Sequence, residues 1–284
     1  MTAALTRPGP SAGTSGSGHD GRAGYREYGD QFAAFYDAVF PREAIGTDEL
    51  AWLRQVLPGR TRRLAELGVG TGRVALPLAG SLLRDEDGPV EYLGVDVSAA
   101  MLGELGSHDP RGLVSPLLAD ITDVTLPTGL DAVLCVCGTL SMITEPRGQA
   151  AAVAAAAAAL RPGGVLVVET HHADAVLALH PTADRSWAVA YPGDRRMLAT
   201  FSHLDGRRWD LEHCWLDAGT ATFARESSRV TSLDEVDAYA TAAGLVPAGR
   251  SAGLRGAPLT PASPTATAVY RRPGPPPPEP DQEG

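Results

Sequence analysis

The chain has 284 residues, with 44% hydrophobic and 20% charged residues and a net charge of −10. This length suits one large α/β domain or two small ones. Every one of the 24 basic residues is arginine, which excludes mechanisms that need a catalytic lysine, such as a Schiff base or a P-loop. The acidic balance argues against a general binder of phosphate backbones.

The two ends of the chain differ in composition from the middle. Residues 1–24 are rich in Gly, Ser, Pro and Thr, and residues 273–284 contain four consecutive prolines followed by acids. We expect both to be disordered tails. We find no signal-peptide pattern and no stretch of the ~18–20 apolar residues that a membrane span needs, and we expect a cytoplasmic protein.

Short apolar runs alternate with helical patterns over residues 61–182, which we interpret as a cofactor-binding core. Alternation of this kind predicts a doubly wound, mostly parallel sheet of the α/β class. The expected strands are 63–67, 90–95, 113–118, 132–136 and 165–169. The expected helices are 72–83, one that begins after Ser98, and 147–160, which should end at Pro162-Gly163-Gly164.

The pattern changes to longer strands over residues 183–230, which predicts an antiparallel insert after the fifth strand. The expected strands are 187–191, 197–203, 208–216 and 220–230, with a hairpin turn at Asp205-Gly206. Residues 231–272 should complete the core sheet with a helix over 232–243 and strands over 245–248 and 265–270. Ser232 and Glu235 fit a capping box at the start of that helix.

A glycine-rich turn after the first strand carries the clearest chemical signal. Gly68, Gly70 and Gly72 would let a ligand approach the backbone, but a dinucleotide fingerprint would need its third glycine at the position of Arg73. Glu66 before the turn suits a cationic ligand better than a pyrophosphate. Asp96, at the tip of the second strand, can accept both ribose hydroxyls of a nucleoside. S-adenosylmethionine fits these demands.

The run from Glu66 to Gly72 resembles the opening motif of class I S-adenosylmethionine-dependent methyltransferases, and the resemblance extends from about Tyr25 to Tyr270. Asp96-Val97-Ser98-x-x-Met101 is similar to the family's ribose and adenine segment, and Ala119-Asp120-Ile121 to the segment that binds the adenine amine. The resemblance implies cofactor contacts at Tyr36, Glu66, Gly68, Gly70, Gly72, Arg73, Asp96, Val97, Met101, Asp120, Ile121 and Cys137. For Arg73, a pair with the cofactor carboxylate and a solvated side chain remain alternatives.

An aromatic stretch near the N-terminus predicts a helical lid within residues 25–60. Tyr25, Tyr28, Phe32, Phe35 and Tyr36 recur at spacings of three or four. Core packing explains Phe32, whereas Tyr28 and Tyr36 are expected to cover the cofactor and the acceptor, and Tyr28 is also a candidate catalytic residue.

Candidate catalytic residues follow the fifth strand, because ligands sit at the carboxyl ends of strands in such sheets. His171 or His172 could remove a proton from the acceptor, and Glu169 could orient one of them or act as the base. A hydrogen-bonded structural role is the alternative for both histidines. His203 and His213 are expected on a solvent-facing side of the insert. Trp187, Tyr191 and Trp215 would wall an aromatic pocket or fill the core.

No metal is expected. Adjacent histidines on a strand point to opposite faces, and the chain has no asparagine for a catechol-type site. Cys135 is expected to be a buried thiol, and Cys137 ends the same apolar strand.

The wording of several motifs resembles small-molecule methyltransferases of actinobacterial secondary metabolism, including antibiotic biosynthesis. The resemblance implies methyl transfer from S-adenosyl-L-methionine to a small acceptor, with S-adenosyl-L-homocysteine as product. We expect the acceptor to be aromatic and to receive the methyl group on oxygen, on nitrogen or on an indole-type carbon. An alternative is a protein that binds this cofactor and promotes a rearrangement or cyclisation. A nucleic-acid substrate and a membrane partner are not expected, a protein substrate is disfavoured, and a monomer or homodimer is expected.

Overall fold

The computed structural model describes residues 21–41, 45–85, 88–191 and 195–274. The expected tails therefore lie largely outside the described residues. The first described helix, α1 (Gly21–Phe32), begins four residues before the expected start of the folded chain at Tyr25.

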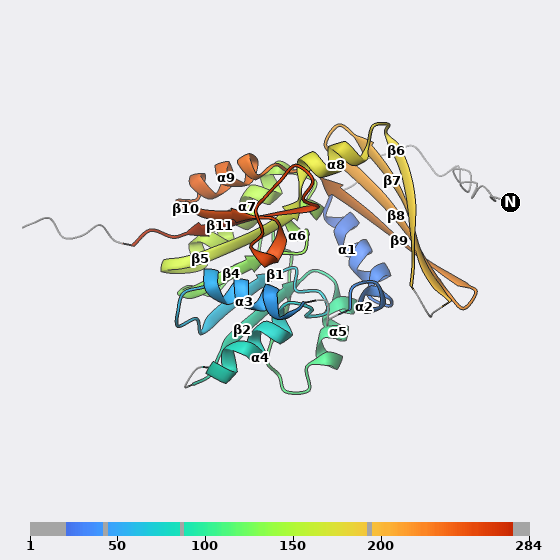
Figure 1. The fold of residues 1–284 in the computed structure, drawn as a ribbon. Coiled ribbons are helices and arrows are strands. Elements are labelled where there is room, and N and C mark those ends of the chain that lie inside the picture. The colour runs from blue at the N-terminus through green and yellow to red at the C-terminus, as the bar shows by residue number, and fades with distance from the viewer. Residues whose placement is uncertain (1–20, 42–44, 86–87, 192–194, 275–284) are drawn as a thin grey trace, which may run out of the picture.

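Seven strands form the central sheet, in the order β10-β11-β5-β4-β1-β2-β3 (Figure 1). The strands β1 to β5 run parallel, and β11 lies antiparallel between β5 and β10. The bounds are β1 (Arg63–Leu67), β2 (Glu91–Asp96), β3 (Ser115–Leu118), β4 (Leu130–Cys135), β5 (Leu160–His171), β10 (Val246–Ser251) and β11 (Thr265–Arg271). The predicted doubly wound fold is confirmed, because the chain winds outward from β1 in both directions.

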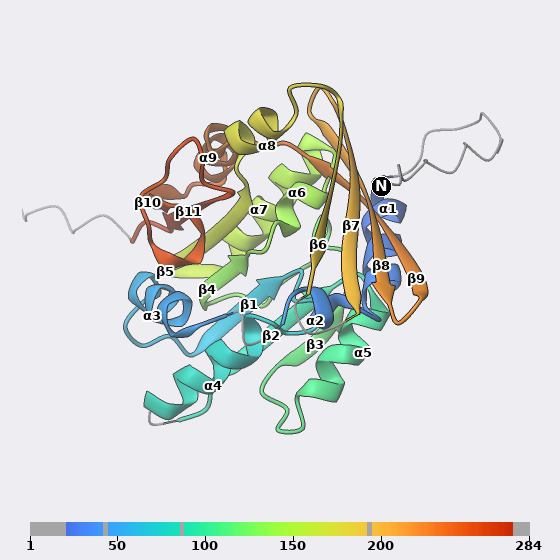
Figure 2. The same ribbon diagram turned by 45° about the vertical axis from the view of Figure 1, so that its right-hand side comes forward.

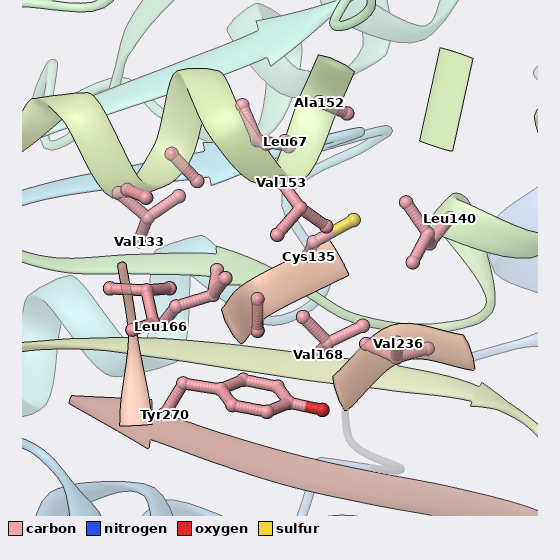
Figure 3. Packing of buried hydrophobic residues seen from close by; sticks show 14 of the residues in the cluster. Leu67, Val133, Cys135, Leu140, Ala152, Val153, Leu166, Val168, Val236 and Tyr270 are labelled. Atoms are coloured by element: carbon pink, nitrogen blue, oxygen red, sulfur yellow. The ribbon is translucent and has the colours of Figure 1, made fainter. Parts of the chain in front are cut away.

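Helices cover both faces of this sheet, which explains why β4 is apolar at almost every position. Val133 and Cys135 face a cluster that includes α7 (Pro146–Ala159) and α9 (Leu233–Ala242), as Figure 3 shows. Ala132 and Leu134 face the opposite cluster. That cluster receives side chains from α3 (Thr47–Val56), α4 (Ala75–Asp85) and α5 (Ala99–His108). A strand buried on both faces gains apolar burial from consecutive residues rather than alternate ones.

Most elements lie within a few residues of their predicted ends, and both predicted caps form. Ser98 accepts a hydrogen bond from the Met101 amide at the start of α5, and Ser232 makes a capping box with Glu235 at the start of α9. The helix predicted from Gly72 begins only at Ala75, because Gly72 still belongs to the turn and bonds the Val69 carbonyl.

The Pro162-Gly163-Gly164 segment does not form a loop after α7. Strand β5 starts at Leu160, directly after that helix, and runs through the segment. The Gly163 amide donates to the Arg272 carbonyl, and the Arg272 amide donates to the Gly164 carbonyl. Pairing with the chain beyond β11 thus absorbs these residues into an irregular strand with a register shift against β4.

The insert is a separate four-stranded antiparallel sheet, in the order β6-β7-β8-β9 (Figure 2). Its strands are β6 (Asp184–Ala190), β7 (Arg196–Asp205), β8 (Arg208–Asp217) and β9 (Thr220–Arg229). The predicted hairpin at Asp205-Gly206 joins β7 and β8, and Gly206 has a φ of +58°. A short helix that the sequence analysis did not anticipate, α8 (Ala173–Leu179), leads from the core into the insert.

The segment expected to be a lid divides into two parts. Helix α1 contacts β9 and α5, and α2 (Tyr36–Val39) shares an apolar cluster with the insert. Helix α3 instead packs against the core near α4 and the 3₁₀ turn η2 (Gly253–Arg255). Only the first part lies where it could cover a ligand. Within the described ranges, no helix is both long and apolar enough to cross a membrane.

Candidate active site

A pocket of about 680 Å³, counting open solvent at its mouth, lies at the carboxyl edge of the core sheet beneath α1. This is the edge at which doubly wound sheets bind ligands. Its lining comes from α1, α2, α5, the turns after β1, β2, β3 and β4, and the short helix α6 (Thr139–Met142). The lining residues are Tyr25, Tyr28, Gly29, Tyr36, Gly68, Gly70, Asp96, Val97, Met101, Ile121, Cys137, Thr139, Met142 and Ile143.

The glycine turn forms the floor of the pocket, as predicted for Gly68 and Gly70. Gly68 has a φ of +73°, and a Cβ there would lie 2.3 Å from Cγ2 of Thr139. Only glycine fits at that point, because its backbone is left-handed and Thr139, at the start of α6, approaches it closely. Gly72 does not line the pocket. A Cβ on Gly72 would meet Leu105 of α5, so this glycine serves packing between the turn and the helix.

Asp96 ends β2 at the rim of the pocket and is held in place from two sides. Its Oδ2 accepts from the Gly70 amide at 2.8 Å, and its Oδ1 accepts from the Ser98 amide at 2.9 Å. Burial raises the pKa of this carboxyl, while the backbone amides oppose that rise. Each carboxylate oxygen retains acceptor capacity, as a ligand with two adjacent hydroxyls requires.

Glu66 does not line the pocket but lies buried beneath the turn. The Tyr92 hydroxyl donates to its Oε2 at 2.7 Å, and the side chain is 2% exposed. Burial raises the pKa of Glu66 to about 7, against the opposing influence of Tyr92 and Arg73. Glu66, for which the resemblance implied a cofactor contact, could therefore act on a ligand only through the turn that it supports from beneath.

Arg73 turns inward, toward the turn after β4, rather than into solvent. Its Nη2 donates to Sγ of Cys137 at 2.8 Å, and Phe40 lies 5.9 Å from the guanidinium carbon. The buried Nε of Arg73 has no hydrogen-bond partner within the described part of the chain. A buried donor without a partner is destabilising, so a carboxylate bound here would be stabilised. This observation fits the carboxylate end of S-adenosylmethionine.

The turn after β4 is strained at Cys137, which has a φ of +58°. The Cys137 amide donates to Oε2 of Glu169 at 2.8 Å, so this carboxylate braces the turn. Glu169 is 7% exposed and does not line the pocket. Burial raises the pKa of the Cys137 thiol to about 12, although Arg73 opposes the rise. Cys135, buried as predicted, has a pKa of about 12 for the same reason.

The apolar end of the pocket contains Val97, Met101 and Ile121, as predicted for an adenine site. Asp120 lies just behind this end. Its Oδ2 accepts from the Tyr25 hydroxyl at 2.5 Å, and its Oδ1 accepts from Thr122. Tyr25 of α1 therefore bonds the carboxylate that the resemblance assigns to the adenine amine.

Besides the bond from Tyr25 to Asp120, two further side-chain hydrogen bonds fasten the covering helices to the core. Ser98 donates to Asp30 of α1 at 2.6 Å, and Thr71 donates to Asp37 of α2 at 2.7 Å. Both Tyr28 and Tyr36 line the pocket from above. Burial raises the pKa of each hydroxyl, so both stay neutral donors at physiological pH.

The candidate catalytic residues after β5 separate in space. His172 turns to the loop before β11, where its Nδ1 lies 3.1 Å from the Ser263 carbonyl, so a structural role explains it. His171 does not line the pocket but lies next to its wall: its Nε2 is 3.0 Å from where a Cβ would be on Gly138, between the lining residues Cys137 and Thr139. It also lies 3.9 Å from Glu226 of β9.

The prediction that His213 faces solvent is wrong. His213 lies on the inner face of the insert, with its Nε2 3.7 Å from Glu226 and its ring 5.6 Å from that of Phe32. His203 is half exposed and pairs with Asp184, as expected of a surface histidine. Trp215 and Tyr191 pack together in the cluster beneath α1, and Trp187 belongs to a smaller cluster near α8.

The sequence analysis assigned no role to Gly29, Thr139, Met142, Ile143 or Glu226. The first four line the pocket, and Glu226 lies in the insert close to it. Their only signal was position after a strand or on an amphipathic helix. Within the described ranges, no group of three or more His, Cys, Asp or Glu side chains has an arrangement that could hold a metal ion, and a metal-free reaction stays a prediction.

Comparison with known proteins agrees with this geometry. Residues 64–164 match the family model described as a methyltransferase domain. A search of curated proteins finds no match. The CcbJ methyltransferase from Streptomyces caelestis is 28% identical, with a TM-score of 0.75 over 87% of this chain and 98% of that one.

Two further solved structures share the fold at lower identity. CalS10, an amino pentose methyltransferase from Micromonospora echinaspora, is 24% identical, with a TM-score of 0.64 over 84% of this chain and 96% of that one. The sugar N-methyltransferase KedS8 from Streptoalloteichus is 21% identical, with a TM-score of 0.63 over 96% of this chain and all of that one, 100%. Because the match to KedS8 covers 96% of this chain, it includes most of the insert as well as the core.

Proposed function

We propose that this chain, which is a class I S-adenosylmethionine-dependent methyltransferase, methylates a small molecule held between its core sheet and its antiparallel insert. The observation that carries the proposal is the pocket beneath α1, which is open at its mouth but roofed by helices that contact the insert. A roofed site of this kind admits a small acceptor and excludes a nucleic-acid duplex or a folded protein.

When bound, S-adenosylmethionine supplies an electrophilic methyl group on its sulfonium sulfur. Asp96 would hold the ribose hydroxyls, Met101 and Ile121 would pack on the adenine, and Arg73 would pair with the carboxylate. Alignment of the reacting atoms and removal of water then provide much of the rate enhancement. Of the predicted catalytic residues, we retain Tyr28, which lines the pocket, and His171, which lies next to the pocket wall.

The first test is calorimetric titration of the protein with S-adenosylmethionine and with S-adenosylhomocysteine. We expect micromolar binding that Asp96→Ala weakens by about 100-fold or more, since two hydrogen bonds to a charged group contribute about 1.5–3 kcal/mol each. Glu104→Ala, an exposed carboxylate on α5, is the matched control and should bind as wild type. Failure of the wild-type protein to bind either compound would overturn the proposal.

Turnover separates methyl transfer from the alternative of a cofactor-promoted rearrangement. Acceptors found by a gain of one methyl group in mass should yield S-adenosylhomocysteine in equal amount. A product that forms without S-adenosylhomocysteine would instead support the rearrangement.

A further inference from the structure

A buried carboxylate flanked by two imidazoles lies on the inner face of the insert. Glu226 of β9 is 8% exposed, and its Oε1 accepts from the Ser228 hydroxyl at 2.5 Å. Nε2 of His171 lies 3.9 Å from the same oxygen, and Nε2 of His213 lies 3.7 Å from Oε2. The cluster therefore joins β5 of the core to β8 and β9 of the insert.

This cluster lies next to the cofactor pocket. The charge of Glu226 acts on the Tyr28 hydroxyl, which lines the pocket from above. The His171 ring leans over Gly138, between the pocket-lining residues Cys137 and Thr139. Helix α6, which carries Thr139, also contacts β9. Glu226 does not itself line the pocket, but through His171 and through the contact of β9 with α6 it lies next to the pocket wall around Cys137 and Thr139.

The charge of Glu226 lacks a matching permanent cation. Within the described part of the chain, its ion-pair partners are the two imidazoles, and both distances exceed hydrogen-bond length. Burial raises the pKa of Glu226, but His213, His171 and Ser228 together hold it below its usual value. A buried carboxylate that stays ionised is stabilised by a cation that can also donate hydrogen bonds.

We propose that Glu226 binds the acceptor as a protonated amine, so that the enzyme methylates nitrogen on a small cationic substrate. This inference rests on the proposed function and adds the acceptor class and the residue that selects it. An N–H of the ammonium would donate to Glu226 beside the donor's methyl group. A hydroxyl acceptor would leave the carboxylate charge unmatched, and the site would therefore favour amines.

An ammonium must lose a proton before its nitrogen can attack. His171 is the imidazole nearest Gly138, and its Nε2 is positioned to take that proton. The freed lone pair then forms the N–C bond as the C–S bond breaks, and the sulfur keeps the electron pair of the broken bond. The products are a methylated ammonium, S-adenosylhomocysteine and one proton that leaves through His171.

Sinefungin tests the charge of this site without a known acceptor. In this analogue of S-adenosylmethionine, an amine-bearing carbon replaces the methylsulfonium, so an ammonium points toward the acceptor. We expect Glu226→Gln to lower the ratio of sinefungin affinity to S-adenosylhomocysteine affinity by about tenfold or more, because two charges a few ångströms apart attract strongly where water is scarce. Binding of S-adenosylhomocysteine itself should not change.

The matched control is Glu212→Gln, which removes a carboxylate from the opposite face of the neighbouring strand β8, where it pairs with Arg225. This variant should keep the wild-type ratio. The second variant, for the case that Glu226→Gln does not fold, is His171→Gln, which changes a partly exposed side chain. It should keep or raise the ratio of sinefungin affinity to S-adenosylhomocysteine affinity, because Glu226 loses an imidazole that competes with the ammonium.

The inference would be overturned if the ratio of sinefungin affinity to S-adenosylhomocysteine affinity in Glu226→Gln stayed within twofold of wild type. It would also be overturned if His171→Gln lost the preference for sinefungin that wild type shows. Absence of wild-type binding to both compounds would instead overturn the proposed function, so the two failures are distinguishable.

Discussion

Single residues of this site combine burial with charge, and Glu66 shows the consequence. It lies beneath the glycine turn with one hydrogen bond from Tyr92, and its pKa of about 7 exceeds the usual 4.5. The folded protein therefore binds a proton that the unfolded chain releases between these two pH values. The resulting stability is full below about pH 4.5 and is lost as the pH rises to about 7.

We predict that Glu66→Gln removes this loss. The difference between 4.5 and about 7 corresponds to roughly 3 kcal/mol in the free energy of unfolding. Urea denaturation at pH 5 and pH 8 should show wild type losing stability with rising pH and the variant losing much less. Asp96, whose pKa is also raised, adds a smaller loss of the same sign. Glu91→Gln, at the exposed start of β2, is the control and should behave as wild type. The prediction would be contradicted if the free energy of unfolding changed equally between pH 5 and pH 8 in wild type, Glu66→Gln and Glu91→Gln.

At the scale of elements, polar side chains help to fix the short covering helices to the core. Helix α2 has four residues, too few to be stable alone. The bond from Thr71 of the glycine turn to Asp37 links the position of α2 to the turn that forms the floor of the pocket. Closing of the cover and order in the turn should therefore be coupled.

We predict that Thr71→Val speeds dissociation of S-adenosylhomocysteine by roughly 10-fold. Loss of a hydrogen bond to a charged group is worth about 1.5–3 kcal/mol, part of which appears as lower stability. Stopped-flow displacement would measure the rate. Thr61→Val is the matched control, because Thr61 is as buried and bonds the Pro58 carbonyl away from the pocket. Equal dissociation rates in the two variants would show that the Asp37 link does not hold the cover.

For the whole molecule, one aromatic cluster joins the cover, the insert and the core. The Phe32 ring of α1 meets that of Phe35 at 4.4 Å, and Phe35 stacks on Trp215 of β8. Met101 of α5 belongs to the same cluster and also lines the pocket. The three parts of the chain therefore share one apolar junction next to the ligand.

We predict that Phe32→Ala lowers the free energy of unfolding by about 3–5 kcal/mol, as expected for a phenylalanine that is 1% exposed. It should also weaken cofactor binding, since Met101 loses its packing partner. Phe223→Ala, on the outer face of the insert and 52% exposed, should change stability by less than about 0.5 kcal/mol. Urea denaturation of both variants measures the two losses in the free energy of unfolding. Losses of similar size would mean that Phe32 is not at the junction.

The sequence by itself determined the sheet, both helix caps and the cofactor end of the site. These features depend on neighbours along the chain: apolar runs buried on two faces, a serine before a helix, and glycines where a strand turns into a helix. Nine of the predicted cofactor and catalytic residues accordingly line the pocket: Tyr28, Tyr36, Gly68, Gly70, Asp96, Val97, Met101, Ile121 and Cys137.

Only the tertiary structure decided the acceptor side. It separated His171 from His172, placed the Glu169 carboxylate on the Cys137 amide, and brought Glu226 and His213 of the insert close to His171 of the core. The 54 residues between His171 and Glu226 contain no periodicity that predicts their approach. Which face of an antiparallel insert turns inward depends on how the sheet docks against α1 and β5. That docking arises from packing between distant segments, which local sequence patterns do not encode.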